Sequence, residues 1–100
     1  MSIDFHTLSR NSRIWIYQAS RSFSPEEIKS ISKEIQEFLE NWKAHGVSLK
    51  AAFEIKYKRF IIIVLDQRHQ IATGCSIDSS VTFIKKLETK YKVNLLDKLN

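Results

Sequence analysis

The chain has 100 residues, of which 43% are hydrophobic and 27% charged, with only two Gly and one Pro. This composition is typical of a folded domain and excludes a disordered chain, and the length allows one core but not two. The single cysteine excludes an internal disulfide, and the longest apolar run, Phe60–Leu65, is far shorter than the roughly 20 residues that cross a bilayer. We expect one cytoplasmic domain over residues 1–100, complete in itself or the N-terminal part of a longer protein.

The net charge of +5 is unevenly distributed. Residues 1–46 hold six Lys/Arg and six Asp/Glu, whereas residues 47–100 hold ten and five. The surplus of positive charge in the second half fits either an anionic partner or an ordinary solvated surface.

A strand is predicted over Arg13–Ala19, which is rich in β-branched and aromatic residues and apolar on both faces. A helix follows, because Ser24, Pro25 and Glu27 have the spacing of a capping box with proline at the first helical position. We expect Gly46 to end this helix in a left-handed conformation. Its apolar stripe recurs at three- and four-residue spacing: Ile28, Ile31, Ile35, Phe38, Leu39 and Trp42.

The segment Leu49–Asp66 alternates apolar and polar residues and then becomes continuously apolar. As one strand it would span about 50 Å, longer than a domain of this size is wide, so we expect a hairpin near Tyr57–Arg59. Lys58 and Arg59 are unusual residues for a tight turn, which leaves a longer loop open.

A second helix is predicted from Ser76 or Asp78 to Tyr91, followed by a short strand at Val93–Leu96. Its expected apolar stripe is Ile77, Val81, Ile84, Leu87 and Tyr91. The order β-α-β-β-α-(β) predicts an α+β, ferredoxin-like two-layer sandwich, with an antiparallel sheet and two helices on one face.

Two helices leave the other sheet face open, although the first and third strands are apolar on both sides. We expect a second copy, another segment of the protein or a ligand to cover that face. The residues chosen for this interface are Trp15, Tyr17, Ile61 and Ile63, with the opposite parity, Ile14 and Ile16, as the alternative.

Three stretches, Arg13–Gln18, Phe53–Phe60 and Gly74–Ser80, resemble an uncharacterised bacterial family whose members are often labelled ABC transporter ATPases. The resemblance covers nearly the whole chain and implies neither an activity nor catalytic residues. A P-loop requires G-x-x-x-x-G-K-[ST], yet neither Gly46 nor Gly74 precedes such a pair, so we reject ATP hydrolysis.

Cys75 lies beside a predicted helix N-terminus, and His69 and Asp66 precede it, so a cysteine-dependent enzyme is one alternative. A buried apolar filler is the simpler interpretation of a lone cysteine. Thr73, Cys75, Ser76 and Ser79 could together form an anion-binding or reactive site, or simply cap the helix. The histidines and Cys75 have no metal-ligand spacing, and we predict neither metal nor cofactor.

Lys56, Lys58 and Arg59 alternate with aromatic residues at the predicted hairpin tip and could contact nucleic acid. The signature of RNA-recognition motifs is met only by Arg59 and Phe60. The sequence therefore favours a non-catalytic interaction or assembly domain, present as a homodimer or paired with a C-terminal extension. A basic nucleic-acid-binding module and an enzyme using Cys75 are the alternatives.

Overall fold

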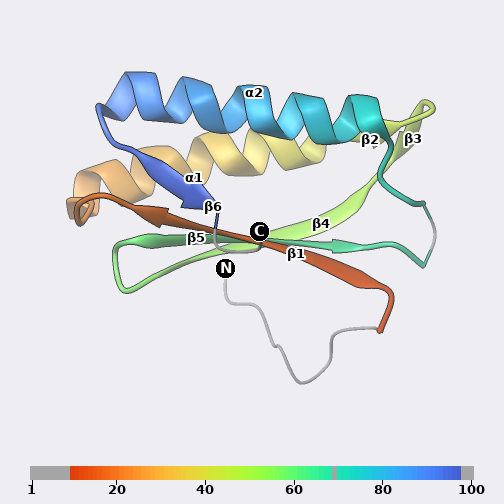
Figure 1. Cartoon of the computed structure of the whole chain (residues 1–100), viewed down its shortest axis with the longest axis horizontal. Coiled ribbons are helices and arrows are strands. Elements are labelled where there is room, and N and C mark those ends of the chain that lie inside the picture. Colours follow the sequence, from red (N-terminus) through yellow and green to blue (C-terminus); the bar gives the residue numbers. More distant parts are fainter. Residues whose placement is uncertain (1–9, 69, 98–100) are drawn as a thin grey trace.

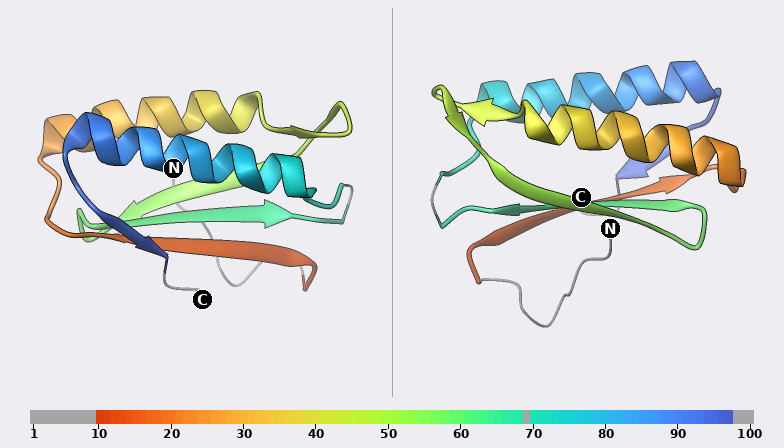
Figure 2. Two further views of the ribbon diagram at one scale, coloured as in Figure 1. Left: turned by 45° about the horizontal axis from the view of Figure 1, so that its top comes forward. Right: turned by 180° about the vertical axis from the view of Figure 1, so that it is seen from behind.

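The computed structural model describes residues 10–68 and 70–97, and these form two layers (Figures 1 and 2). Both long helices lie on the same side of the main sheet, so the predicted α+β class is confirmed. The elements in chain order are β1 (Ser12–Ala19), α1 (Pro25–Glu40), β2 (Lys43–Ala44), β3 (Val47–Ser48), β4 (Lys50–Lys56), β5 (Phe60–Asp66), α2 (Gly74–Tyr91) and β6 (Leu95–Asp97).

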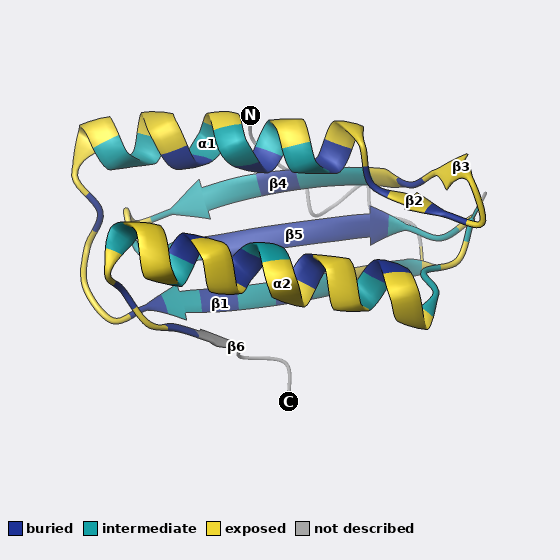
Figure 3. Ribbon diagram, turned by 90° about the horizontal axis from the view of Figure 1, so that it is seen from above, coloured by how far each residue is buried: buried dark blue, intermediate teal, exposed yellow. Residues whose placement is uncertain are grey.

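The main sheet has the strand order β4-β5-β1-β6, and every neighbouring pair is antiparallel. The register of β1 and β5 places Trp15 opposite Ile63 and Tyr17 opposite Ile61. Because side chains alternate along a strand, these odd-numbered residues all point toward the helices. They form one core with the inner faces of both helices. Figure 3 colours most of β5 as buried.

Helix α1 begins as the sequence predicts. The Ser24 hydroxyl accepts a hydrogen bond from the Glu27 amide, and the Glu27 carboxylate accepts one from the Ser24 amide. Residues Ile31, Ile35 and Leu39 on its inner face are buried. A helix with this cap and this apolar stripe needs no further local signal to form.

The helix ends at Glu40, so the expected stop at Gly46 is wrong. His45 and Gly46 instead form the left-handed turn of the short β2–β3 hairpin, with φ of 51° and 75°. Trp42 lies beyond the helix, is buried, and donates an indole hydrogen bond of 2.8 Å to the backbone oxygen of Ser76. Burial of this ring against α2 turns the chain away from the helical path.

Helix α2 begins at Gly74, earlier than the predicted Ser76 or Asp78, because Thr73 is the N-cap residue. Ile84 and Leu87 of the predicted stripe are buried, whereas Val81 is exposed. Buried Ser76 and Ser80 replace apolar residues on the inner face near the start of α2, and the hydroxyl of each donates to a backbone carbonyl three residues earlier. Small hydroxyl side chains satisfied in this way can enter a core at little cost.

Ile61 lies on the central strand β5 and is 0% exposed, so its substitution tests how far the fold depends on that strand. Ile61→Ala leaves a cavity beneath both helices and should lower the free energy of unfolding by about 2–5 kcal/mol. Urea denaturation monitored by tryptophan fluorescence measures this loss. A loss below about 1 kcal/mol would place Ile61 outside the core.

Candidate functional site

The four residues chosen for an interface lie inside the protein. Trp15, Tyr17, Ile61 and Ile63 are buried between the sheet and the helices, so their choice as interface residues was wrong. The reason is strand parity, which the sequence pattern leaves undecided because both faces of β1 and β5 are apolar.

The opposite parity forms the helix-free face of the sheet, and its central residues are Ile14, Ile16, Ile62 and Val64. Ile14 pairs with Val64, and Ile16 pairs with Ile62. Ile62 and Val64 are 7% and 4% exposed, while Ile14 and Ile16 are partly buried. None of the large exposed hydrophobic residues in the described part of the chain lies among these four. The face is therefore aliphatic, and its centre is buried in the single chain rather than left open.

The hydroxyl cluster at the start of α2 is engaged in capping. Thr73 Oγ1 accepts from the Ser76 amide, and Ser76 Oγ accepts from the Thr73 amide at 2.8 Å. Ser79 donates to the backbone oxygen of Cys75 at 3.0 Å. These bonds satisfy the helix end itself, which favours the capping interpretation over an anion site.

Cys75 is exposed rather than a buried filler. The carboxylate of Asp66, the expected catalytic orienter, binds the Arg68 guanidinium at 2.6–3.0 Å. Predicted partner His69 lies outside the described residues. Within residues 10–68 and 70–97, no three His, Cys, Asp or Glu side chains group as metal ligands would.

The exposure of Cys75 predicts rapid modification. Iodoacetamide should alkylate the native thiol within about threefold of the rate for the urea-unfolded chain, because no packing restricts access. Cys75→Ala should change the free energy of unfolding by less than about 0.5 kcal/mol. Strong protection in the native state would contradict this placement.

The β4–β5 hairpin turns where the sequence predicts, but through an unexpected conformation. Lys56 and Phe60 pair at its end, and the Arg59 amide donates to the Lys56 carbonyl at 3.0 Å. Tyr57 and Lys58 have φ of 55° and 58°, in the left-handed region. Each non-glycine residue there costs about 1–2 kcal/mol, which tertiary contacts must offset.

Those contacts come from the connection between β1 and α1. The Lys58 carbonyl accepts from the Phe23 amide at 2.7 Å, and the Arg59 carbonyl accepts from the Ala19 amide at 2.8 Å. The Arg59 side chain folds back and donates to the carbonyls of Ala19 and Ser20 at 3.0 and 3.2 Å. The tip is thus anchored to the body of the domain and does not project as an unsupported loop.

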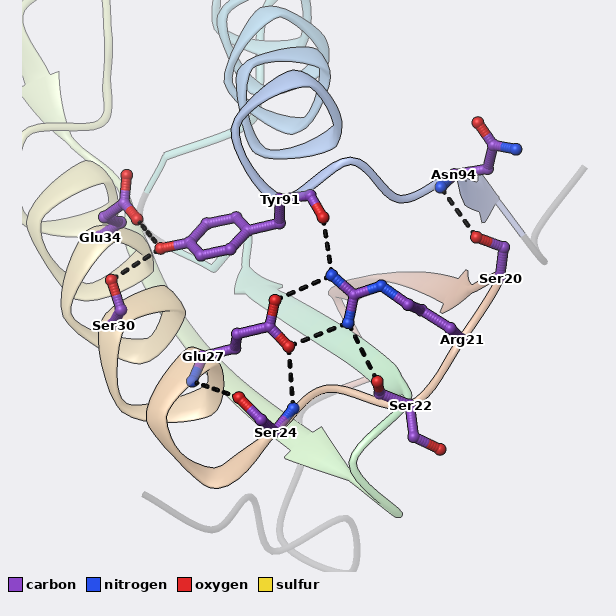
Figure 4. Close-up of polar contacts among 9 residues, drawn as sticks. All are labelled: Ser20, Arg21, Ser22, Ser24, Glu27, Ser30, Glu34, Tyr91 and Asn94. Atoms are coloured by element: carbon purple, nitrogen blue, oxygen red, sulfur yellow. Dashed lines mark hydrogen bonds and ion pairs between the residues drawn. The ribbon is translucent and has the colours of Figure 1, made fainter.

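A polar cluster that no sequence pattern predicts joins the start of α1 to the end of α2 (Figure 4). Arg21 forms two hydrogen bonds of 2.8 and 2.9 Å with the Glu27 carboxylate and a third of 2.7 Å with the Tyr91 carbonyl. Arg21 and Tyr91 are 70 positions apart, so no local pattern signals the contact. Within this cluster, the sequence predicts only the capping box formed by Ser24 and Glu27.

The same cluster continues along α1. The Tyr91 hydroxyl lies 2.7 Å from Ser30 Oγ and donates to Glu34 at 2.5 Å, while Lys90 forms an ion pair with Glu34 at 3.2 Å. Partial burial, followed by the Glu34 contact, raises the pKa of Tyr91. Each of these ionisable groups has a partner within the domain, so the cluster links α1 to α2.

The ion pair between Arg21 and Glu27 predicts a pH dependence. The Arg21 hydrogen bonds, and then the Ser24 amide, lower the pKa of Glu27 from 4.5 to about 2. The resulting stability is present above pH 4.5 and is lost as the pH falls toward 2. Glu27→Gln should therefore destabilise the protein at pH 7, and its difference from the wild type should shrink across that window in urea titrations. Glu26→Gln is the matched control and should show a smaller difference at both ends.

Shallow grooves mark the described surface, and two of them adjoin α1. One of about 580 Å³ runs between the helices above the stacked rings of Phe38 and Phe83, whose centroids are 4.5 Å apart. The other, of about 480 Å³, lies beside the β4 edge near Leu39 and Ala51. The lining of the first groove includes Glu37, Lys86 and Ser79, and the Ser79 hydroxyl donates to the backbone oxygen of Cys75.

Comparisons with protein-family models, curated proteins and solved structures find no match for this chain. Among the described residues, neither helix combines the length and the apolar character needed to cross a membrane.

Proposed function

We propose that this domain is a non-catalytic assembly module that associates through the helix-free face of its sheet. The observation that carries the proposal is the aliphatic strip Ile14, Ile16, Ile62 and Val64 on the side where neither helix lies. Ile62 and Val64 are buried in the single chain, so the contact we propose rests on Ile14 and Ile16, which stay partly exposed. A sheet that is apolar on both faces requires two covering layers, and α1 and α2 supply one.

The proposed topology is ferredoxin-like. It is supported by the order β4-β5-β1-β6, in which the two strands apolar on both faces occupy the centre. The alternating strand β4 lies at an edge, where one polar face is expected. In such a sandwich the helices occupy one face, and the other is the natural contact surface.

The chemistry of the described residues supports association over catalysis. The polar groups of the Arg21 cluster bind one another, and the hydroxyls of Thr73 and Ser76 cap α2. An enzyme using Cys75 is less well supported, because Asp66, its expected acidic residue, forms an ion pair with Arg68. The resemblance to a family labelled as ATPases adds no competing chemistry, since the chain has no P-loop.

The partner we propose is a second copy, which would set one aliphatic strip against the other. A C-terminal extension of the same protein could cover the strip instead. Analytical ultracentrifugation separates the two, because a homodimer of this chain has twice its mass of 11.7 kDa. If the chain stays monomeric up to about 1 mM, the dissociation constant of any dimer is too high for specific association. That result would contradict self-association.

A charge placed on the strip should break the dimer. Ile16→Lys introduces an ammonium group that the contact would have to desolvate, and the dissociation constant should rise at least about tenfold. Gln18→Lys is the control, since it adds the same charge to the same face beyond the strip. Circular dichroism must show that both variants fold. Equal weakening by the two would point to net charge rather than to the strip.

A further inference from the structure

The tip of the β4–β5 hairpin has left-handed backbone angles at two residues that rarely adopt them. The three-residue connection 57–59 contains a β-turn, closed by the Arg59 amide on the Lys56 carbonyl, with Tyr57 and Lys58 at its centre. Two consecutive left-handed residues at the centre of a β-turn are typical of Asn-Gly. Strained backbone of this kind is common at functional sites, so the side chains of Tyr57 and Lys58 are candidates for a binding role.

The contacts that hold the turn do not require these two side chains. Residues 57 and 58 are anchored through backbone atoms, with the Lys58 carbonyl accepting from the Phe23 amide and the neighbouring Arg59 amide closing the turn. Asn and Gly would provide the same backbone groups at a lower conformational cost. The backbone contacts of the turn therefore give no reason for the aromatic ring and the ammonium group at this tip.

The ring of Tyr57 is presented to solvent, with 81% of the residue exposed. Its contact in the domain is the edge-on ring of Phe60, at a centroid distance of 6.3 Å and an interplanar angle of 86°. Phe60 pairs with Gln18 and so lies at one end of the helix-free face. The tip thus offers an accessible aromatic surface on a fixed support.

The tip also carries uncompensated positive charge. Among the described residues, no carboxylate lies within 4.0 Å of the charged groups of Lys58 or Arg59. Arg59 donates to neutral carbonyls, so its hydrogen bonds leave the charge in place. Lys56 lies 3.7 Å from Glu54 and adds less net charge. Two cations without a carboxylate partner among the described residues therefore follow the exposed ring in the sequence.

We propose that this hairpin tip binds single-stranded nucleic acid, with a base stacked on Tyr57 and phosphates beside Lys58 and Arg59. Unpaired bases expose the aromatic faces that such a ring stacks on, and a flexible phosphate backbone can follow a short basic surface. Duplexes hide their base faces and fit less well. Binding through one ring and two cations is sequence-tolerant and strongly salt-dependent. The inference goes beyond the proposed assembly role and does not depend on it.

The decisive experiment uses the double variant Tyr57→Asn/Lys58→Gly. Fluorescence anisotropy with a labelled twelve-nucleotide oligothymidylate at about 20 mM salt reports binding at the ionic strength where phosphate contacts are strongest. The variant should lose at least about tenfold in affinity, since it removes both the stacking ring and one cation. Its melting temperature should rise by several degrees, because Asn and Gly suit the turn. A purely structural role predicts unchanged affinity.

Single substitutions separate stacking from charge. Tyr57→Phe should retain binding, because the phenyl ring still stacks. Lys58→Gln should lower the slope of log affinity against log salt by about 0.7, the value for one phosphate contact to a single strand. Lys86→Gln removes an exposed charge from α2, away from the tip, and should leave that slope unchanged.

Several results would overturn the inference. They are a wild-type protein that binds no oligonucleotide at 20 mM salt, equal affinity for duplex and single strand, or affinity that survives the double variant. Binding to phosphatidylserine vesicles without oligonucleotide binding would assign the tip to membranes instead. Oligonucleotide binding by a chain that stays monomeric would support this inference while removing the self-association proposed above.

Discussion

The arrangement of this domain follows from one constraint: β5 is apolar on both faces, but two helices can cover only one. Its residues 61–65 are all buried, and alternate side chains point to opposite layers. On one side Ile61, Ile63 and Leu65 form the core with α1 and α2. On the other, Ile62 and Val64 form an aliphatic strip with β1. The assembly role that we propose comes from this second layer.

Most of the polar groups described above stabilise the fold, whereas a few are free to bind a partner. The capping boxes, the Arg21 cluster and the bond from Trp42 to Ser76 use their donors and acceptors within the domain. The hairpin tip differs, because its backbone is engaged while Tyr57 and Lys58 point into solvent. Groups that a fold does not need for its own stability are the most informative about binding.

Local signals were sufficient to predict much of this fold. The capping box at Ser24 and the change of period after Leu49 located α1 and the long hairpin correctly, because each depends on residues close in sequence. The choice of sheet face failed, since both parities of β1 are apolar and only the packed helices decide between them. The end of α1 was misplaced because burial of Trp42 is a tertiary effect. The left-handed Tyr57 was likewise imposed by distant backbone groups.

The connection between β1 and α1 is short and exposed, yet three distant parts of the chain converge on it. Ser20 accepts from Arg59 and from the Asn94 amide, Arg21 reaches Glu27 and Tyr91, and the amide of Phe23 meets the hairpin turn. Surface connections usually accept insertions freely. This one should not: lengthening it by a single residue would shift every one of these attachments at once. A connection made mostly of Ser and Arg should therefore tolerate insertions poorly.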